Sequence, residues 1–282
     1  MEKKAWVLLN GCPQASIDPF DRGFQYGDGV FTTLRVVDGI PLLGNEHLCR
    51  LERDAARIRL PGFDASLLRR EMTDLGRRCS QGILKIQLTR GVSERGYQVP
   101  QPLVPTRFLS IRPHIPFSSD LPNGLRVRLS EQRLSINPLL SGIKHMNRLE
   151  QVMARMEWDD PDIDESLMMD TEGFLVEGTM TNLFLFKDQT LLTPLIDRCG
   201  VQGVMRDCVI QMARSRGFDV RETRLELSSI QVAEAMFLTN SIRGICPVRE
   251  FCGQSLPGRD FALKVHEWYL DALRQSLGAW VA

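Results

Sequence analysis

The order in which β patterns and helical patterns follow one another constrains this fold more than any other sequence feature. In the first 114 residues, strands are predicted at 5–11, 29–43, 82–91 and 106–114, and helices at 45–60 and 65–79. Asp38-Gly39 supplies a tight hairpin turn within the second strand pattern, and Asn45 is expected to cap the first helix. This irregular order favours an α+β (mixed α/β) fold over a regular βαβ alternation.

A segment rich in Pro, Ser, Asp and Gly, residues 115–124, is the expected linker between two domains. Beyond it the pattern restarts, so we predict an N-terminal domain at 1–114 and a C-terminal domain at 125–282. The second domain is predicted to contain strands at 125–130, 218–223, 235–240 and 244–250, hairpins at 165–178 and 182–193, and helices at 142–156, 203–216 and 259–276.

The composition indicates a globular chain and excludes several classes of protein. Of 282 residues, 43% are hydrophobic, and 35 Lys and Arg balance 35 Asp and Glu, so no nucleic-acid partner is expected. The seven cysteines include no Cys-x-x-Cys pair, which is typical of reduced cytoplasmic thiols. No apolar run is long enough for a membrane helix or a signal peptide. Together, the thiols and the lack of such a segment lead us to expect a cytoplasmic protein. The four scattered histidines lack metal-ligand spacing, so no metal site is expected.

Residues 142–156 place a lysine where a helix disfavours positive charge. Apolar residues recur here at steps of three and four, which predicts an amphipathic helix that begins at Gly142 and buries one stripe. Because a helix start carries partial positive charge, Lys144 and His145 are unfavourable there by about half a kcal/mol. The same field would lower the pKa of the Lys144 amine and make it available as a nucleophile or base. Alternatively, Lys144 is a surface lysine that reaches solvent.

Three further segments of the second domain could hold an anion or a buried charge. A helix that starts directly after a glycine would present the N–H groups of Val204 and Met205 to a phosphate. Ser241 ends a strand pattern, where its hydroxyl could meet an anion. Glu177 follows an apolar strand, so its carboxylate is expected to be half buried and to need a cationic partner. Each segment could equally be an ordinary turn or helix start.

Motifs along nearly the whole chain resemble the class IV pyridoxal-phosphate enzymes, which include branched-chain and D-amino-acid aminotransferases. They are DRGFQYGDGVF at 21–31, Arg50 followed by Leu51, the lysine after the linker, EGTMTNLF at 177–184, GVQGVMR at 200–206 and TNSIRGICPV at 239–248. Without the resemblance, Arg50 is typical of a charged helix face. Three stretches resemble the lyases of this family rather than its aminotransferases: FTTLRV at 31–36, TRGVSERGY at 89–97 and GIKHMNRLEQV at 142–152.

The resemblance implies the two-domain architecture of fold type IV, with pyridoxal 5'-phosphate at the domain interface and its lysine in the C-terminal domain. Lys144 would bind the cofactor as a Schiff base and then act as the general base. Glu177 would keep the pyridine nitrogen of the cofactor protonated. The phosphate would be held by Arg50, the amides of Val204 and Met205, and the Ser241 hydroxyl.

For the lyase branch, the resemblance implies a carbon–oxygen lyase of folate biosynthesis that converts 4-amino-4-deoxychorismate to 4-aminobenzoate and pyruvate. This substrate is a dianion, and the candidate donors to it are Tyr97, Thr33, Arg107 and Arg243. The resemblance also implies a homodimer whose pocket is completed near the subunit boundary. No role is assigned to His145.

Two other functions stay open at this point. A class IV aminotransferase acting on D- or branched-chain amino acids would use the same cofactor residues, and it would need a keto-acid acceptor that the lyase does not need. A non-catalytic phosphate- or partner-binding protein with this fold would be colourless. An acceptor-free product assay and the visible absorbance of the protein distinguish these three functions.

Overall fold

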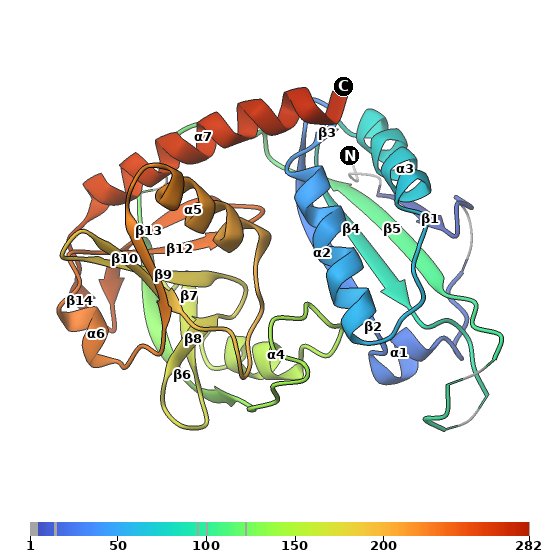
Figure 1. Cartoon of the computed structure of the whole chain (residues 1–282), viewed down its shortest axis with the longest axis horizontal. Coiled ribbons are helices and arrows are strands. Elements are labelled where there is room, and N and C mark those ends of the chain that lie inside the picture. Colours follow the sequence, from blue (N-terminus) through green and yellow to red (C-terminus); the bar gives the residue numbers. More distant parts are fainter. Residues whose placement is uncertain (1–4, 14–15, 95, 100, 122, 282) are drawn as a thin grey trace. The chain divides into compact units, whose positions relative to one another are not determined.

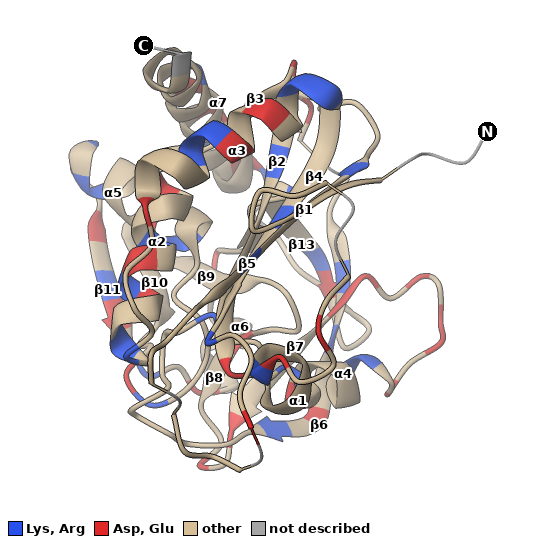
Figure 2. Ribbon diagram, turned by 90° about the vertical axis from the view of Figure 1, so that its right-hand side faces the viewer, with Lys and Arg blue, Asp and Glu red and all other residues tan. Residues whose placement is uncertain are grey.

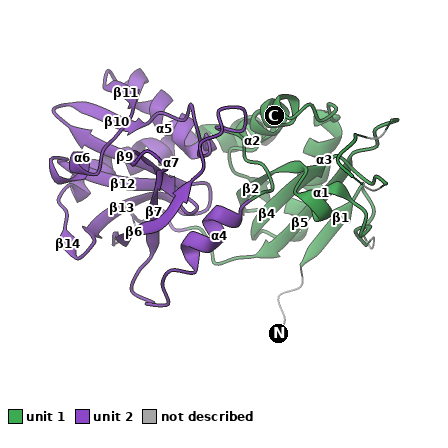
Figure 3. Ribbon diagram, turned by 90° about the horizontal axis from the view of Figure 1, so that it is seen from below, with its two compact units in different colours: residues 1–117, 143–147, 273–282 green, residues 118–142, 148–272 purple. Residues whose placement is uncertain are grey.

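The computed structural model describes residues 5–13, 16–94, 96–99, 101–121 and 123–281 (Figure 1). The chain divides into two compact units, drawn in green and purple in Figure 3. Unit 1 comprises residues 1–117, 143–147 and 273–282, and unit 2 comprises residues 118–142 and 148–272. Each unit combines a sheet with helices, so the predicted mixed α/β class is confirmed.

Unit 1 is built on a five-stranded antiparallel sheet with the strand order β1-β5-β4-β2-β3. Its strands are β1 (Trp6–Leu9), β2 (Gly29–Val37), β3 (Ile40–Pro41), β4 (Gln81–Thr89) and β5 (Thr106–Pro113). The short helix α1 (Arg22–Tyr26) precedes β2, and helices α2 (Gly44–Arg57) and α3 (Ala65–Arg78) pack against the sheet (Figure 1). The core between them contains Leu34 of β2, Leu51 of α2 and Leu68 of α3, all essentially inaccessible to solvent.

Turn and cap chemistry explains most of the boundaries in unit 1. The predicted hairpin between β2 and β3 is present, and both Asp38 and Gly39 have the positive φ that such a turn requires. Helix α3 is capped by Asp64, whose carboxylate accepts from the N–H of Leu67 at 2.9 Å. The predicted Asn45 cap is wrong. Helix α2 begins one residue earlier, and the Asn45 side chain instead accepts a hydrogen bond from Arg69.

Unit 2 is built on a larger sheet with the strand order β11-β10-β9-β12-β13-β6-β7-β8, in which β14 also pairs with β13. The strands are β6 (Leu125–Leu134), β7 (Glu165–Asp170), β8 (Leu175–Gly178), β9 (Asn182–Lys187), β10 (Thr190–Pro194), β11 (Asp219–Thr223), β12 (Ala235–Asn240), β13 (Gly244–Phe251) and β14 (Gln254–Ser255). Strand β8 also pairs with β9, where Glu177 lies opposite Asn182. This pairing closes β9, β12, β13, β6, β7 and β8 into a ring.

The helices of the second half are α4 (Leu149–Arg155), α5 (Val204–Ser215), α6 (Ser228–Gln231) and α7 (Arg259–Val281). The hairpins β7–β8 and β9–β10 and helix α5 lie where the sequence predicts them. Helix α5 packs against β11 and β12. The first part of α7 belongs to unit 2, and its last residues, from 273, belong to unit 1.

The predicted helix start at Gly142 is wrong. Helix α4 begins only at Leu149, and residues 143–147 pair with β2, with His145 opposite Val30. The expected buried stripe is also wrong beyond Ile143, because Leu149 is 72% exposed and Met156 70% exposed. The physical reason is tertiary pairing. Backbone groups that a helix would bond internally are bonded here to β2 and to a carboxylate of α2.

The predicted domain boundaries also differ from the two units. The first division falls after Phe117, within the predicted linker at 115–124. However, residues 143–147, with Lys144, belong to unit 1 and not to the C-terminal domain proposed at 125–282. Ile143 explains this assignment because its side chain is fully buried in the core of unit 1. Trp280 is buried in the same core, which places the end of the chain in unit 1 as well.

Charged side chains and thiols are spread over the described part of the chain. Basic and acidic segments are interspersed, for example along α3 (Figure 2). All seven cysteines are free thiols, and burial raises the pKa of both Cys199 and Cys246 to about 12. Among the described residues, no helix is long and apolar enough to span a bilayer, and no cluster of three potential metal ligands occurs.

Candidate functional site

Lys144 is held by backbone contacts to β2 and by a carboxylate of α2. Its carbonyl accepts from the N–H of Phe31 at 3.0 Å, and its own N–H donates to Asp54 Oδ2 at 2.9 Å. The Lys144 Nζ lies 4.7 Å from the centroid of the Phe31 ring, and the Lys85 Nζ lies 5.1 Å from the same centroid. The lysine is therefore fixed by contacts within unit 1. The helix-dipole argument for a lowered lysine pKa does not apply, because no helix begins there.

Helix α2 presents three polar side chains on one face toward this segment. His47, Arg50 and Asp54 are spaced by three and four residues and are all buried, with exposed fractions of 0%, 6% and 1%. Arg50 Nη2 donates to the hydroxyl of Thr32 on β2. Arg50 is thus no member of a solvated helix face, and it shares with Lys144 a small buried polar cluster in unit 1.

His47 completes this cluster as a neutral group. Its Nδ1 lies 2.6 Å from Thr32 Oγ1, and its ring is inaccessible to solvent. Burial lowers the pKa of His47 well below the usual value, and the positive charges of Arg50 and Lys144 lower it further. The imidazole is therefore uncharged at neutral pH.

Glu177 lies in unit 2 at the point where the ring of strands closes. Its side chain is 4% exposed, and its Oε2 accepts from the N–H of Val201 at 2.8 Å. Asn182, opposite Glu177 on β9, donates from Nδ2 to the carbonyl of Val201 at 2.8 Å. These two side chains fix the loop that leads into α5. The sequence prediction of a half-buried Glu177 underestimates its burial.

A second buried carboxylate shapes the turn after Glu177. Glu165 on β7 accepts from the N–H and Oγ1 of Thr179, at 3.1 and 2.5 Å, and from Oγ1 of Thr181 at 3.1 Å. Its side chain is only 2% exposed. A carboxylate that accepts several hydrogen bonds is well satisfied in the interior. Glu165 therefore fixes the turn that contains Thr179 and Thr181. Glu177 is the carboxylate that accepts from the loop at Val201.

The predicted anion-binding elements of unit 2 are brought together by Asn182. Gly203 precedes α5 with no side chain to cap the N–H groups of Val204 and Met205, and a Cβ at Gly203 would collide with Asn182 Oδ1. Asn182 also lies opposite Thr239 on β12, two residues before Ser241. The Thr239 hydroxyl is buried and has no hydrogen-bond partner among the described residues. Asn182 thus neighbours both the uncapped N–H groups at the start of α5 and Thr239, and free N–H groups at a helix start are suited to an anion.

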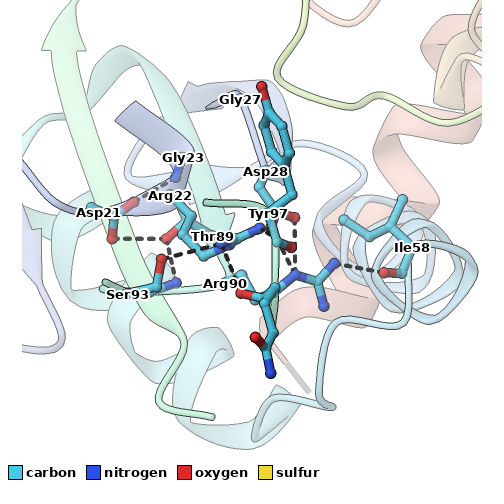
Figure 4. Close-up of polar contacts among 12 residues, drawn as sticks. Asp21, Arg22, Gly23, Gly27, Asp28, Ile58, Thr89, Arg90, Ser93 and Tyr97 are labelled. Carbon is cyan, nitrogen blue, oxygen red and sulfur yellow. Dashed lines mark hydrogen bonds and ion pairs between the residues drawn. The ribbon is translucent and has the colours of Figure 1, made fainter. Parts of the chain in front are cut away.

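The loop that carries Tyr97 is held by a buried arginine (Figure 4). The Arg22 guanidinium donates to the carbonyls of Gly96, Tyr97 and Gln98 at 3.1 to 3.3 Å. Asp28 accepts from both Arg22 and Arg90 at 2.8 Å. Burial acts to raise the pKa of Asp28, but hydrogen bonds and charge from the two arginines outweigh it and lower that pKa. The Tyr97 side chain itself is 83% exposed and has its ring centroid 5.4 Å from that of Tyr26.

The remaining predicted substrate residues occupy different places. Thr33 lies on the same face of β2 as Phe31, the ring beside Lys144 Nζ, because alternate residues of a strand share a face. Arg243 is exposed on the turn between β12 and β13, beside Ser241. Arg107 forms an ion pair with Glu71 of α3, with contacts of 2.6 and 2.7 Å. This ion pair fixes the Arg107 side chain within unit 1, and Arg107 stays a candidate substrate residue.

Sequence reasoning missed three residues of the unit 1 cluster: Thr32, His47 and Asp54. The spacing of His47, Arg50 and Asp54 along one helix was a signal available in the sequence, because residues three and four apart share a face. The role of Thr32 had no such signal, since its partners come from another element.

The comparisons with known proteins identify the family of this chain. The model of the family Amino-transferase class IV matches residues 29–251, so the chain belongs to that family. Two curated relatives represent different activities within it. An aminodeoxychorismate lyase from Vibrio harveyi is 34% identical over 247 residues, which cover 86% of this chain and 89% of that protein. A putative branched-chain-amino-acid aminotransferase from Methanocaldococcus jannaschii is 32% identical, covering 94% and 95% of the two chains.

Solved structures show the same fold. The crystal structure of 4-amino-4-deoxychorismate lyase from Pseudomonas aeruginosa has a TM-score of 0.87 and 37% identity, covering 94% of this chain and 98% of that one. A hypothetical aminotransferase from Mycobacterium tuberculosis in its PLP-bound form has a TM-score of 0.81 with 20% identity, covering 95% and 98%. At that identity, the second structure supports the fold alone.

Proposed function

We propose that this chain is a pyridoxal-phosphate-dependent lyase that converts 4-amino-4-deoxychorismate to 4-aminobenzoate and pyruvate. The observation that carries the proposal is the likeness, over nearly the full chain, to two proteins named as this lyase, one of them at 37% identity and a TM-score of 0.87. The lyase-like motifs in the sequence support the same choice, and GIKHMNRLEQV at 142–152 contains Lys144 itself.

The described residues suit pyridoxal 5'-phosphate. We assign the covalent attachment to Lys144 and the phosphate to Arg50, the amides of Val204 and Met205, and Ser241. A buried arginine, an uncapped helix start and a buried unpartnered hydroxyl at Thr239 are the donors that a phosphate dianion needs. The family motifs support this assignment.

Glu177 would set the electronic state of the bound cofactor. When bound, pyridoxal phosphate supplies an electron sink for the charge left as a C–H proton departs. That property requires a protonated pyridine nitrogen, and a buried carboxylate such as Glu177 is the group that stabilises it. The N–H of Val201 holds Glu177 Oε2 in place.

Lys144 would move the proton on which the elimination depends. Its amine takes the proton from the ring carbon that bears the substrate amine, and the enolpyruvyl oxygen leaves from the neighbouring carbon. The ring becomes aromatic as the carbon–oxygen bond breaks, and protonation of the leaving enolpyruvate gives pyruvate. Tyr97, Thr33, Arg107 and Arg243 are the proposed donors to the substrate carboxylates.

The decisive experiment is an assay for products without an acceptor. Purified enzyme loaded with pyridoxal phosphate and given 4-amino-4-deoxychorismate should release 4-aminobenzoate and pyruvate in equal amounts, with no keto acid added. Product formation that appears only when a keto acid is supplied would refute the lyase proposal.

The second candidate is a class IV aminotransferase acting on D- or branched-chain amino acids. The specific observation in its favour is the 32% identity to the Methanocaldococcus jannaschii protein over 95% of its length. It predicts conversion of a D- or branched-chain amino acid to its keto acid in the presence of 2-oxoglutarate.

We also propose a cytoplasmic homodimer. Apolar side chains lie exposed on α4, where Leu149 is 72%, Val152 52% and Met153 46% accessible, and exposed apolar surface of this kind is typical of subunit contacts. The seven free thiols suit a reducing compartment. Light scattering should give twice the monomer mass, and a monomer at working concentration would contradict this assembly.

A further inference from the structure

Unit 1 contains a buried histidine that the proposed mechanism does not use. His47 lies on α2, three residues before Arg50, and its ring is inaccessible to solvent. Its Nδ1 lies 2.6 Å from Thr32 Oγ1, and the same hydroxyl accepts a hydrogen bond from Arg50 Nη2. Three side chains from two elements therefore form one chain of hydrogen bonds.

The donor and acceptor roles in these hydrogen bonds follow from counting the hydrogens available. A hydroxyl has one hydrogen to donate and can accept from two donors. Arg50 uses one acceptor position of Thr32 Oγ1, and His47 Nδ1 is the acceptor within reach of the Thr32 hydrogen among the described residues. We therefore assign Nδ1 as the acceptor and the ring hydrogen to Nε2, which is buried and has no hydrogen-bond partner among the described residues. The order is Arg50 to Thr32 to His47, with each group donating to the next.

Burial, helped by neighbouring positive charge, keeps His47 in this neutral form. Burial lowers its pKa well below the usual value, and Arg50 and Lys144 add to the effect. A protonated ring would turn Nδ1 into a donor and leave the Thr32 hydrogen without its acceptor. It would also place a third positive charge beside Arg50 and Lys144. The surroundings thus preserve the imidazole as a hydrogen-bond acceptor.

Uncharged hydrogen-bond partners such as Thr32 and His47 have a specific advantage for an arginine that binds an anion. Arg22 and Arg90, elsewhere in unit 1, share the Asp28 carboxylate, which offsets their charge locally (Figure 4). A hydroxyl backed by an imidazole orients a guanidinium without contributing a negative charge that would repel a phosphate. The Asp54 carboxylate, one turn further along α2, accepts from the Lys144 N–H and from Arg53.

We propose that His47 and Thr32 are positioning residues that hold the Arg50 guanidinium in the orientation that binds the phosphate group of the cofactor. This proposal rests on the assignment of Arg50 to the cofactor phosphate made above. His47 acts through Thr32, and Thr32 acts through Arg50, so neither needs to touch the phosphate.

The test compares two ligands that differ in the phosphate alone, pyridoxal 5'-phosphate and pyridoxal. Dissociation constants for both are measured by absorbance titration of the purified full chain after its cofactor has been removed. The variants form matched pairs. Thr32→Val removes the hydroxyl at nearly constant volume and Thr32→Ser keeps it, while His47→Leu removes the acceptor and His47→Asn retains one near the Nδ1 position. His266→Asn, at a buried histidine of unit 2 bonded to Ser119, is the control.

Thr32→Val and His47→Leu should weaken pyridoxal phosphate about 10-fold, as loss of a hydrogen bond to a charged group predicts, and change pyridoxal less than about 2-fold. Thr32→Ser, His47→Asn and the control should remain close to wild type for both ligands. Equal weakening of the two ligands, no weakening, or failure of His47→Asn to restore affinity would overturn the positioning role. A wild-type chain that binds neither ligand would instead refute the cofactor proposal together with this inference.

Discussion

The residues assigned to the cofactor in unit 1 and those in unit 2 act through different chemical groups. In unit 1 the assigned groups are side chains, Lys144 and Arg50, oriented by other buried side chains on α2 and β2. In unit 2 they are largely backbone N–H groups at the start of α5, with one carboxylate at Glu177. Side chains can be removed by substitution, whereas backbone donors cannot. Substitutions in the two units should therefore have very different consequences.

The largest effect is expected at Lys144. Lys144→Ala removes the amine proposed both to hold the cofactor and to take the substrate proton, so kcat should fall at least about 10³-fold. Visible absorbance of the cofactor-loaded protein should also disappear. Lys85→Ala is the matched control because Lys85 Nζ contacts the same Phe31 ring, and it should retain the absorbance. A Lys144→Ala protein with an unchanged spectrum would remove Lys144 from the site.

Glu177→Gln should show the next largest effect. This change keeps the shape of the side chain but removes its negative charge, so the cofactor should remain bound while kcat falls about 10²-fold. Cofactor content is measured by absorbance and kcat by pyruvate release. Near-normal turnover would mean that Glu177 has no electronic role.

The pH dependence of stability should report the neutral state of His47. As the pH falls from about 6.5, the unfolded chain takes up a proton on His47 that the folded chain refuses, because the folded pKa is lowered. The free energy of unfolding should therefore decrease below pH 6.5, by up to about 1.4 kcal/mol per pH unit, and be independent of this group above it. The pKa of Asp28 is lowered from its ordinary value of 3.8, so protonation of Asp28 affects the free energy of unfolding only at a lower pH than His47 does.

Urea unfolding of wild type and His47→Asn between pH 5 and 8 measures this contribution. The difference in unfolding free energy between the two proteins should change below pH 6.5 and be flat above it. Parallel profiles throughout would show that His47 is not held neutral in the folded chain.

The smallest effect is expected at Val204. Val204→Ala shortens a buried side chain but leaves the backbone N–H in place, so the affinity for pyridoxal phosphate should change less than about 2-fold. Stability should fall by about 1 kcal/mol through lost packing. A large loss of affinity at Val204, measured by the same absorbance titration, would contradict the assignment of the backbone as the phosphate donor in unit 2.

The comparison also explains which parts of the site could be predicted from the sequence. The start of α5 and the strand before Glu177 follow from local patterns, namely a glycine before a helix and an apolar run. The conformation at Lys144 could not be found in this way. Its helical periodicity is overridden by bonds to β2 and to Asp54, which lies 90 residues away.

Long-range partners decide the contacts of other side chains as well. The sequence around Arg107 does not show that its guanidinium pairs with Glu71. The sequence around Asn45 does not show that its side-chain oxygen accepts a hydrogen bond from Arg69. The spacing of His47, Arg50 and Asp54 predicts that they share a face of one helix, but the hydrogen bonds of His47 and Arg50 to Thr32 come from another element and are not visible in the sequence. Family motifs located Lys144, Arg50 and Glu177 as candidates, and the structure supplied the neighbours that fix them.

Reductive trapping locates the residue that binds the cofactor, which we propose is Lys144. The loaded protein is treated with borohydride, digested, and mapped by mass spectrometry for the phosphopyridoxyl group. The modification is expected on the peptide that contains Lys144 and not on the peptide that contains Lys85. Modification at Lys85 or at any other lysine, or no modification in a protein that releases 4-aminobenzoate, would show that Lys144 does not bind the cofactor.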